Sequence, residues 1–366
     1  MTDKKKPTPL LFVYLLNIIA CFAVVLLHTT LPVYAPSPSK SWLEMVILQS
    51  AAICATPLFF MISGMNLLGY RERYSTETFF RKRFWRVGRA LLLGSVVCYL
   101  LYGLRPGWFY GAESFSGRFG LFDFVSRFLT NSINDTYWFF YSIIYLYVLT
   151  PIISLVVKHR RVLEYMLGLL LLISILFPFM ERFGLPADYV NHLFGWPLFS
   201  TVSLLYFLGG YYLHRYWKPI RGQMLIMVFV VILSVMLMAV LTLRANRFGQ
   251  ADKYVAYYAG ITSPLCVIES AAVFLLAQSL EPMLHRLPQR VVGWMKLLSG
   301  AALGIYLFHI LLINWMHPDP VSHVLASMGR LPIMKAVIVY VVTAVIVLAG
   351  KKLIGLAKRL VATGRS

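Results

Sequence analysis

Long apolar runs separated by short polar segments follow one another along the whole chain. A helix needs roughly 20 apolar residues to cross the hydrocarbon core of a bilayer, and ten runs are close to that length. The predicted spans cover residues 10–31, 43–69, 87–104, 137–157, 162–180, 197–214, 224–243, 254–278, 297–316 and 333–350. The run at 87–104 is short, and the run at 197–214 is rich in Tyr and Gly. The pattern predicts an all-α, polytopic integral membrane protein with about ten transmembrane helices.

Lys and Arg are divided unevenly between the two sides of these spans. The side that holds both chain ends has 24 of the 34 basic residues, and the opposite side has 10. Basic residues gather on the cytoplasmic side of membrane proteins, so we expect both termini in the cytoplasm and an even number of spans. Residues 1–350 form one predicted transmembrane domain. Residues 351–366 form a basic cytoplasmic tail, typical of an amphipathic helix lying on membrane lipid.

Composition favours a multi-pass protein of the cell membrane over other classes. The chain is 59% apolar and 13% charged, with a mean hydropathy of +0.73, whereas soluble domains are about a quarter charged. The net charge of +20 does not indicate nucleic-acid binding, because the basic residues lie in short loops between apolar runs. We expect neither disulfides nor a metal site, because the cysteines are far apart inside apolar runs. They are Cys21, Cys54, Cys98 and Cys266.

Among the polar side chains inside the predicted spans, where burial in lipid is costly, four are singled out as candidates. His28 and His309 fall in the outer halves of the first and ninth spans, at a similar depth, while Asn17 and Glu269 fall in the inner halves of the first and eighth. Each histidine could simply bond a neighbouring carbonyl, Asn17 could join two helices, and Glu269 could be protonated or paired with a cation. They are also candidates for chemistry, since histidine titrates near neutral pH.

The basic stretch ETFFRKRFWRVGR precedes the third span. In a helix its Arg83 and Arg86 share one face. The stretch could set the topology and attract anionic lipid, or it could hold a phosphorylated cytoplasmic cofactor, because arginine pairs bidentately with phosphate. The chain has no GxGxxG or GxxxxGK[ST] loop, so the sequence does not indicate a nucleotide-hydrolysing enzyme.

Six segments along nearly the whole chain have a familiar order: NIIACFAVVLLHTT, PLFFMISGMNLL, FFRKRFWRVGRALL, YWFFYSIIYLYVLTPII, YFLGGYYL and GIYLFHILLI. Together they resemble acyltransferase family 3, whose members acylate cell-surface glycans and related acceptors. The second segment resembles the family helix that ends in a Ser-Gly pair, here Ser63 and Gly64. The fourth resembles its Trp-containing helix, here with Trp138. Members commonly carry an arginine where this chain has Asn17, and an amide brings no charge.

The resemblance implies an acyltransferase that moves an acyl group, expected to be acetyl, from cytoplasmic acyl-CoA (acetyl-CoA) to a hydroxyl of a surface or lipid-linked glycan. It implies that His28 is the general base or the nucleophile that carries the acyl group. Arg83 and Arg86 would bind the donor, with Asn17 along its route. Further candidates for lining this route are His309, Glu269, Ser63, Trp138 and Tyr306.

Two other classes fit parts of the same pattern. A proton-coupled transporter or exporter would also show many spans, intramembrane His and Glu, and a span interrupted by a proline, here Pro264. The chain lacks the paired repeats typical of such carriers. A membrane-embedded assembly partner is the third class, and it predicts that His28 can be replaced without consequence.

Overall fold

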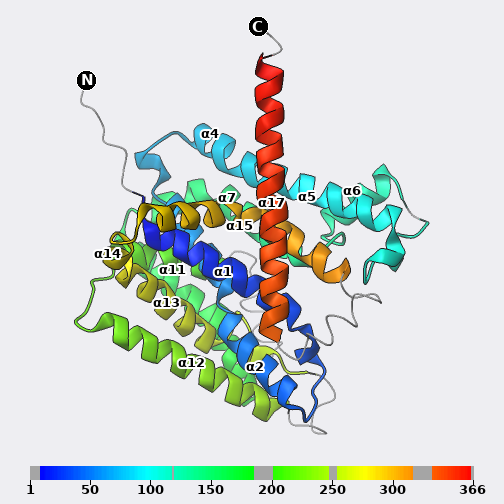
Figure 1. Cartoon of the computed structure of the whole chain (residues 1–366). Helices are drawn as coiled ribbons and strands as arrows, with labels where there is room; N and C mark the ends of the chain where they lie inside the picture. Colours follow the sequence, from blue (N-terminus) through cyan, green and yellow to red (C-terminus); the bar gives the residue numbers. More distant parts are fainter. Residues whose placement is uncertain (1–8, 118, 185–200, 247–253, 316–331, 364–366) are drawn as a thin grey trace, which may run out of the picture.

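The computed structural model describes residues 9–117, 119–184, 201–246, 254–315 and 332–363, and every regular element in these ranges is helical (Figure 1). The longer helices are α1 (Leu11–Thr29), α2 (Lys40–Ala52), α3 (Ala55–Leu67), α5 (Trp85–Leu104), α7 (Trp138–Val156), α8 (Arg160–Leu171), α11 (Val202–Tyr216), α12 (Gln223–Ala245), α13 (Pro264–Ser279), α15 (Gln289–Trp315) and α17 (Pro332–Thr363). Short helices connect them, including α4 (Thr76–Phe79), the π-helix η3 (Phe80–Phe84), α6 (Leu121–Leu129), the π-helix η7 (Leu172–Leu176), α9 (Phe177–Met180) and α14 (Glu281–Leu284).

Nine helical segments of the described chain are long and apolar enough to cross a membrane, and each matches a predicted span. The run at 197–214 differs. Its first four residues lie outside the described ranges, and the rest belongs to α11, which has 15 residues. That length is about 22 Å, which is less than the roughly 30 Å of hydrocarbon. The prediction of a polytopic helical membrane protein is confirmed, with nine candidate spans in the described residues and α11 as a short, largely buried helix among them.

Helix α1 lies inside the bundle and packs against α2, α3, α13, α15 and α17. Half of its span is buried, whereas only 22% of the α12 span and 28% of the α17 span is buried, as expected for helices that face lipid. Figure 1 places α12 along one edge of the bundle and α5 with α6 along the opposite edge. The residues of α1 are therefore positioned by neighbours on several sides.

Two contacts define the ends of this bundle. At the start of α1, the backbone N–H groups of Leu11 and Phe12 donate to the carboxylate of Glu281 over 2.9 and 2.6 Å. A carboxylate there satisfies free N–H groups and favours the helix dipole. Beyond the other end of α1, the rings of Tyr34 and Tyr254 meet edge to face, with centroids 5.0 Å apart. We call these the Glu281 end and the Tyr34 end.

Helices α3 and α11 pack with their backbones in close contact. A Cβ atom at Gly64 would lie 1.7 Å from the carbonyl oxygen of Phe207, and one at Gly210 would lie 2.2 Å from that of Met61. Small residues allow such close approach between membrane helices. The Ser-Gly pair of the second span therefore has a structural role: Gly64 brings α11 against the helix that carries Ser63.

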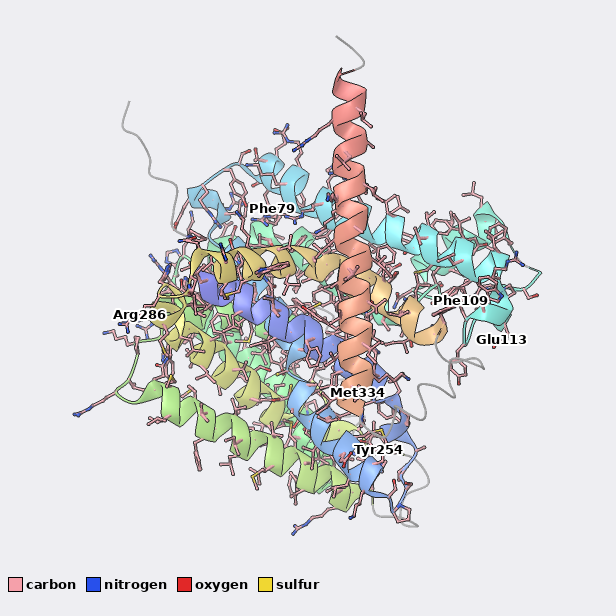
Figure 2. All side chains as sticks on the ribbon, in the orientation of Figure 1. Phe79, Phe109, Glu113, Tyr254, Arg286 and Met334 are labelled. Atoms are coloured by element: carbon pink, nitrogen blue, oxygen red, sulfur yellow. The ribbon has the colours of Figure 1, made fainter. Side chains whose placement is uncertain are left out.

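Helix α17 continues without a break across the predicted boundary between residues 350 and 351. Residues 351–357 are exposed, and Figure 2 shows the last turns of this helix clear of the other helices. The basic tail is thus the continuation of the last span. Its place on the membrane surface stays a prediction.

Candidate functional site

The structure brings the two intramembrane histidines together. His28 lies in the last turn of α1, and His309 lies in the second half of α15. Their ring centroids are 5.2 Å apart, with the ring planes tilted by 44°. The expectation of a similar depth is confirmed, and the two side chains form a pair toward the Tyr34 end.

The hydrogen bonds of His309 determine which nitrogen is protonated. Its Nδ1 lies 2.7 Å from the carbonyl oxygen of Tyr306 and 3.2 Å from that of Ile305. Carbonyl oxygens only accept hydrogen bonds, so Nδ1 carries the proton and donates it. In neutral His309 the Nε2 atom is then an acceptor. It is buried and has no hydrogen-bond partner among the described residues.

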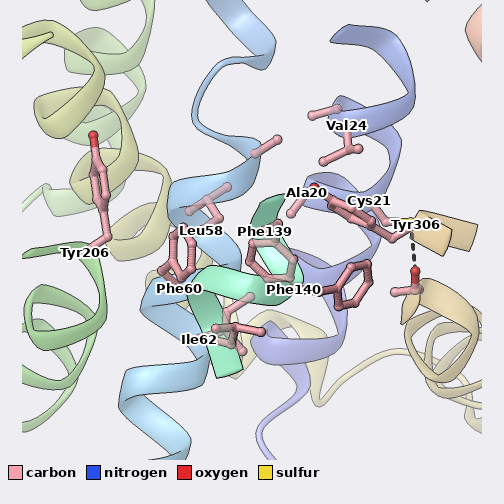
Figure 3. Close-up of a cluster of buried hydrophobic side chains, with 14 of the residues drawn as sticks. Ala20, Cys21, Val24, Leu58, Phe60, Ile62, Phe139, Phe140, Tyr206 and Tyr306 are labelled. Atoms are coloured by element: carbon pink, nitrogen blue, oxygen red, sulfur yellow. Dashed lines mark hydrogen bonds between the residues drawn. The ribbon is translucent and has the colours of Figure 1, made fainter. Parts of the chain in front are cut away.

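A cavity of about 170 Å³ lies beside α1, nearer the Glu281 end than the histidine pair. Most of its wall is apolar. Phe139 and Phe140 of α7 pack against Tyr306 of α15, with ring centroids 5.2 and 5.1 Å apart (Figure 3). The polar residues of the wall are Asn17, Ser63, Tyr147, Ser299 and Tyr306. We call this space the site cavity.

Tyr306 joins the site cavity to the histidine pair. Its ring lies in the cavity wall and also meets the ring of His309 edge to face, with centroids 5.8 Å apart. Elsewhere in the cavity wall, the Asn17 side-chain amide donates to the Ser299 hydroxyl over 3.2 Å. This bond links α1 to α15 and holds the amide in the wall. Asn17 therefore both connects two helices and lines the site cavity.

Arg83 and Arg86 lie at the end of the site cavity away from the histidine pair. We call this the arginine end. Arg83 belongs to the π-helix η3 and Arg86 to the first turn of α5, directly before the cavity residue Val87. Both guanidinium groups are within electrostatic range of Tyr147, whose hydroxyl lies beside Ser63. Neither arginine forms an ion pair with a carboxylate in the described part of the chain.

Aromatic packing anchors this basic stretch. Phe79, which ends α4 just before η3, is fully buried, with its ring centroid 4.6 Å from Tyr70 and 6.1 Å from Tyr147. Apolar residues of the stretch thus enter the bundle while the arginines stay at its rim. The result is two cations that are partly or fully accessible and have no counter-ion within the described ranges.

Glu269 and Trp138 do not line the site cavity. Glu269 was expected in the inner half of its span, but α13 begins only at Pro264, so Glu269 lies in the second turn, toward the Tyr34 end. It is buried beside Cys54 and pairs with no Lys or Arg of the described residues. Trp138 is 36% exposed and packs against Phe60, with ring centroids 6.4 Å apart.

Of the residues predicted along the donor route, Asn17, Ser63 and Tyr306 line the site cavity, and His309 lies directly behind Tyr306. The sequence did not point to Tyr147 or Ser299. Each is one of several polar residues of its helix, and neither has a charge that would mark it. Only the pairing of α1 with α15 and of α7 with η3 identifies them.

Comparison with known proteins supports one family. No curated protein and no solved structure matched the chain. The family model of the acyltransferase domain matches residues 11–350, which include the histidine pair, the arginine end and every residue of the site cavity. The chain therefore belongs to acyltransferase family 3 and is a multi-pass membrane acyltransferase.

Proposed function

We propose that the protein transfers an acetyl group from cytoplasmic acetyl-CoA to a hydroxyl group of a surface or lipid-linked glycan. The observation that carries the proposal is the site cavity between two unlike ends. One end has two arginines without a counter-ion among the described residues, and the other leads through Tyr306 to the pair of His28 and His309. An anionic donor suits the first end, and proton transfer suits the second.

The donor would bind with its phosphates at the arginine end, where Arg83 and Arg86 offer planar guanidinium groups to phosphate oxygens. Its uncharged arm and acyl group would enter the mostly apolar site cavity. The Asn17 amide and the Ser63 hydroxyl lie in the wall, and they can bond the amide or carbonyl oxygens of that arm. Asn17 cannot add charge, so phosphate binding depends on the arginines.

The acceptor hydroxyl would react at the histidine pair. His28 takes the hydroxyl proton while the oxygen forms an ester bond with the acyl carbon, and the carbon–sulfur bond breaks. The released thiolate then takes the proton from His28. General-base help of this kind contributes roughly 10²–10⁴-fold. His309 would support the base: its Nδ1 donates to the backbone, and its Nε2, which has no hydrogen-bond partner among the described residues, can accept a hydrogen bond beside His28.

The cavity residue Asn17 and the histidine pair are far apart along α1. From Asn17 to His28 the helix rises about 16 Å, at 1.5 Å per residue. An extended donor arm, rather than the acyl group alone, is needed to bridge that distance. We place both termini and the arginine end in the cytoplasm, where acyl-CoA is made, and the protein in the cell membrane with the histidines toward the outer face.

A transfer assay in inverted membrane vesicles tests the proposal. The vesicles are formed with envelope glycan enclosed in the lumen, where the outer face lies, and labelled acetyl-CoA is added to the medium. The unmodified protein is compared with His28→Ala at equal expression. His159→Ala is the matched control, because His159 is exposed in the loop before α8. We expect transfer to fall at least 10²-fold in His28→Ala and to stay unchanged in His159→Ala.

The other outcomes are equally informative. Full transfer by His28→Ala would remove His28 from the chemistry. Label that remains covalently on the unmodified protein, but not on His28→Ala, would identify His28 as a nucleophile that forms an acyl-imidazole. An absence of transfer by the unmodified protein would contradict the acetyl donor or the glycan acceptor.

A further inference from the structure

A third cation reaches the arginine end from the last helix. The Nζ atom of Lys351, in α17, donates a hydrogen bond to the carbonyl oxygen of Gly300 in α15. Gly300 directly follows Ser299, the cavity residue that accepts from Asn17. Lys351 is also within electrostatic range of Arg86. The ammonium group therefore lies where α15, α17 and the start of α5 come together.

The three cations share an unusual environment. Neither Lys351 nor the two arginines form an ion pair with any carboxylate of the described residues. Arg86 and Lys351 are exposed, and Arg83 is partly exposed. Like charges held close together repel. An anion with several negative groups, bound between the three cations, would reduce this repulsion. The Gly300 carbonyl occupies only one of the three N–H donors of the ammonium group.

We infer that Lys351 is a binding residue for the phosphates of the acyl-CoA donor and acts together with Arg83 and Arg86. The inference rests on the proposed function and adds a residue from the last helix to that site. Coenzyme A carries a diphosphate and a separate monophosphate, so its charges can engage cations on two helices. Lys351 is a point charge on a long, flexible stem, whereas each arginine offers a planar fork.

An anionic lipid headgroup has the same phosphate chemistry and is the other source of such a ligand. Both arms of the test use full-length protein in nanodiscs, one made of zwitterionic lipid and one containing a fifth of anionic phosphatidylglycerol. Coenzyme A binding is measured in both arms, and bound phosphatidylglycerol in the second, for the unmodified protein, Lys351→Met and Lys352→Met. Methionine keeps the length of the side chain and is a good helix former. Lys352 is the matched control, since it is the next residue of α17 and is also exposed.

In zwitterionic nanodiscs we expect the affinity for coenzyme A to fall about tenfold in Lys351→Met, the size of one charge-assisted hydrogen bond. It stays unchanged in Lys352→Met. In the transfer assay, KM for acetyl-CoA rises by a similar factor and kcat is retained, because the residue binds the donor and does not touch the reacting atoms. Lys351→Arg should keep most of the affinity.

Three results would overturn the inference. Equal affinities for the unmodified protein and Lys351→Met would do so and leave the proposed function intact. A loss of bound phosphatidylglycerol with unchanged coenzyme A affinity would assign Lys351 to a lipid headgroup. A failure of the unmodified protein to bind coenzyme A in either nanodisc would overturn the donor itself, and with it the role of Lys351.

Discussion

At the scale of single residues, Asn17 has the clearest position. It lies in the cavity wall and is bonded to Ser299, at a position where the resemblance to the family leads us to expect an arginine. An arginine would extend the positive charge of the arginine end into the cavity. With an amide there, charge is confined to the rim. This distribution suits a donor whose phosphates stay outside while its neutral arm enters.

Asn17→Ala and Ser299→Ala form a double-mutant cycle for this bond. Each single change should raise KM for the acyl-CoA donor about threefold to tenfold, since a hydrogen bond contributes about 0.5–1.5 kcal/mol. The double variant should be no worse than the poorer single variant, because both changes remove the same bond. The measurement is steady-state kinetics in the transfer assay. Additive losses would show that the two side chains act separately.

At the scale of elements, the apolar runs predicted most helices, because a span needs a minimum length of apolar chain. The apolar runs did not predict the residue at which α13 begins. The predicted span began at 254, but η9 (Tyr257–Ala259) and an irregular turn precede the helix, and its start at Pro264 moved Glu269 toward the opposite end. Proline is favoured in the first turn of a helix, so Pro264 was an available signal for that boundary.

The site was less predictable than the spans. His28, His309 and the arginines could be named from the sequence because charged or titratable groups are conspicuous in apolar runs. The arrangement of these residues could not be predicted from the sequence, because it depends on which helices pack together. The contact between Asn17 and Ser299 joins residues 282 positions apart. No local pattern of apolar residues specifies such a pairing.

The close packing of α3 against α11 leads to a prediction with a built-in control. Gly210→Ala would place a Cβ atom 2.2 Å from the Met61 carbonyl oxygen, whereas Gly209→Ala has nothing within 4 Å. A backbone atom cannot move aside as a side chain can. We expect Gly210→Ala to destabilise the protein by about 1–3 kcal/mol. Gly209→Ala should be neutral or stabilising by up to about 1 kcal/mol.

Thermal unfolding of purified protein in one detergent measures both variants. The clash also displaces α3, which carries Ser63 beside the site cavity, so transfer activity should fall with stability in Gly210→Ala. Equal melting temperatures for the two alanine variants would mean that α3 and α11 do not pack as described.

At the scale of the whole molecule, the basic residues predict which end of the bundle faces the cytoplasm. All four native cysteines are buried, so single introduced cysteines report accessibility against a low background. Ala35 is exposed in the loop after α1, and Lys218 is exposed in the loop before α12. An impermeant maleimide should label Ala35→Cys in intact cells and Lys218→Cys only after permeabilisation. The reverse pattern would contradict both the orientation and the placement of the donor site.

The contact between Glu281 and the first residues of α1 has a consequence for biosynthesis. The chain emerges at about 5–20 residues per second, and Glu281 follows Leu11 by 270 positions. Tens of seconds therefore pass before the start of the first span receives its carboxylate. The helix that carries Asn17 and His28 gains these two hydrogen bonds only when most of the protein has been made. A chain that ends before residue 281 would retain His28 but lack the carboxylate that accepts from the first turn of its helix.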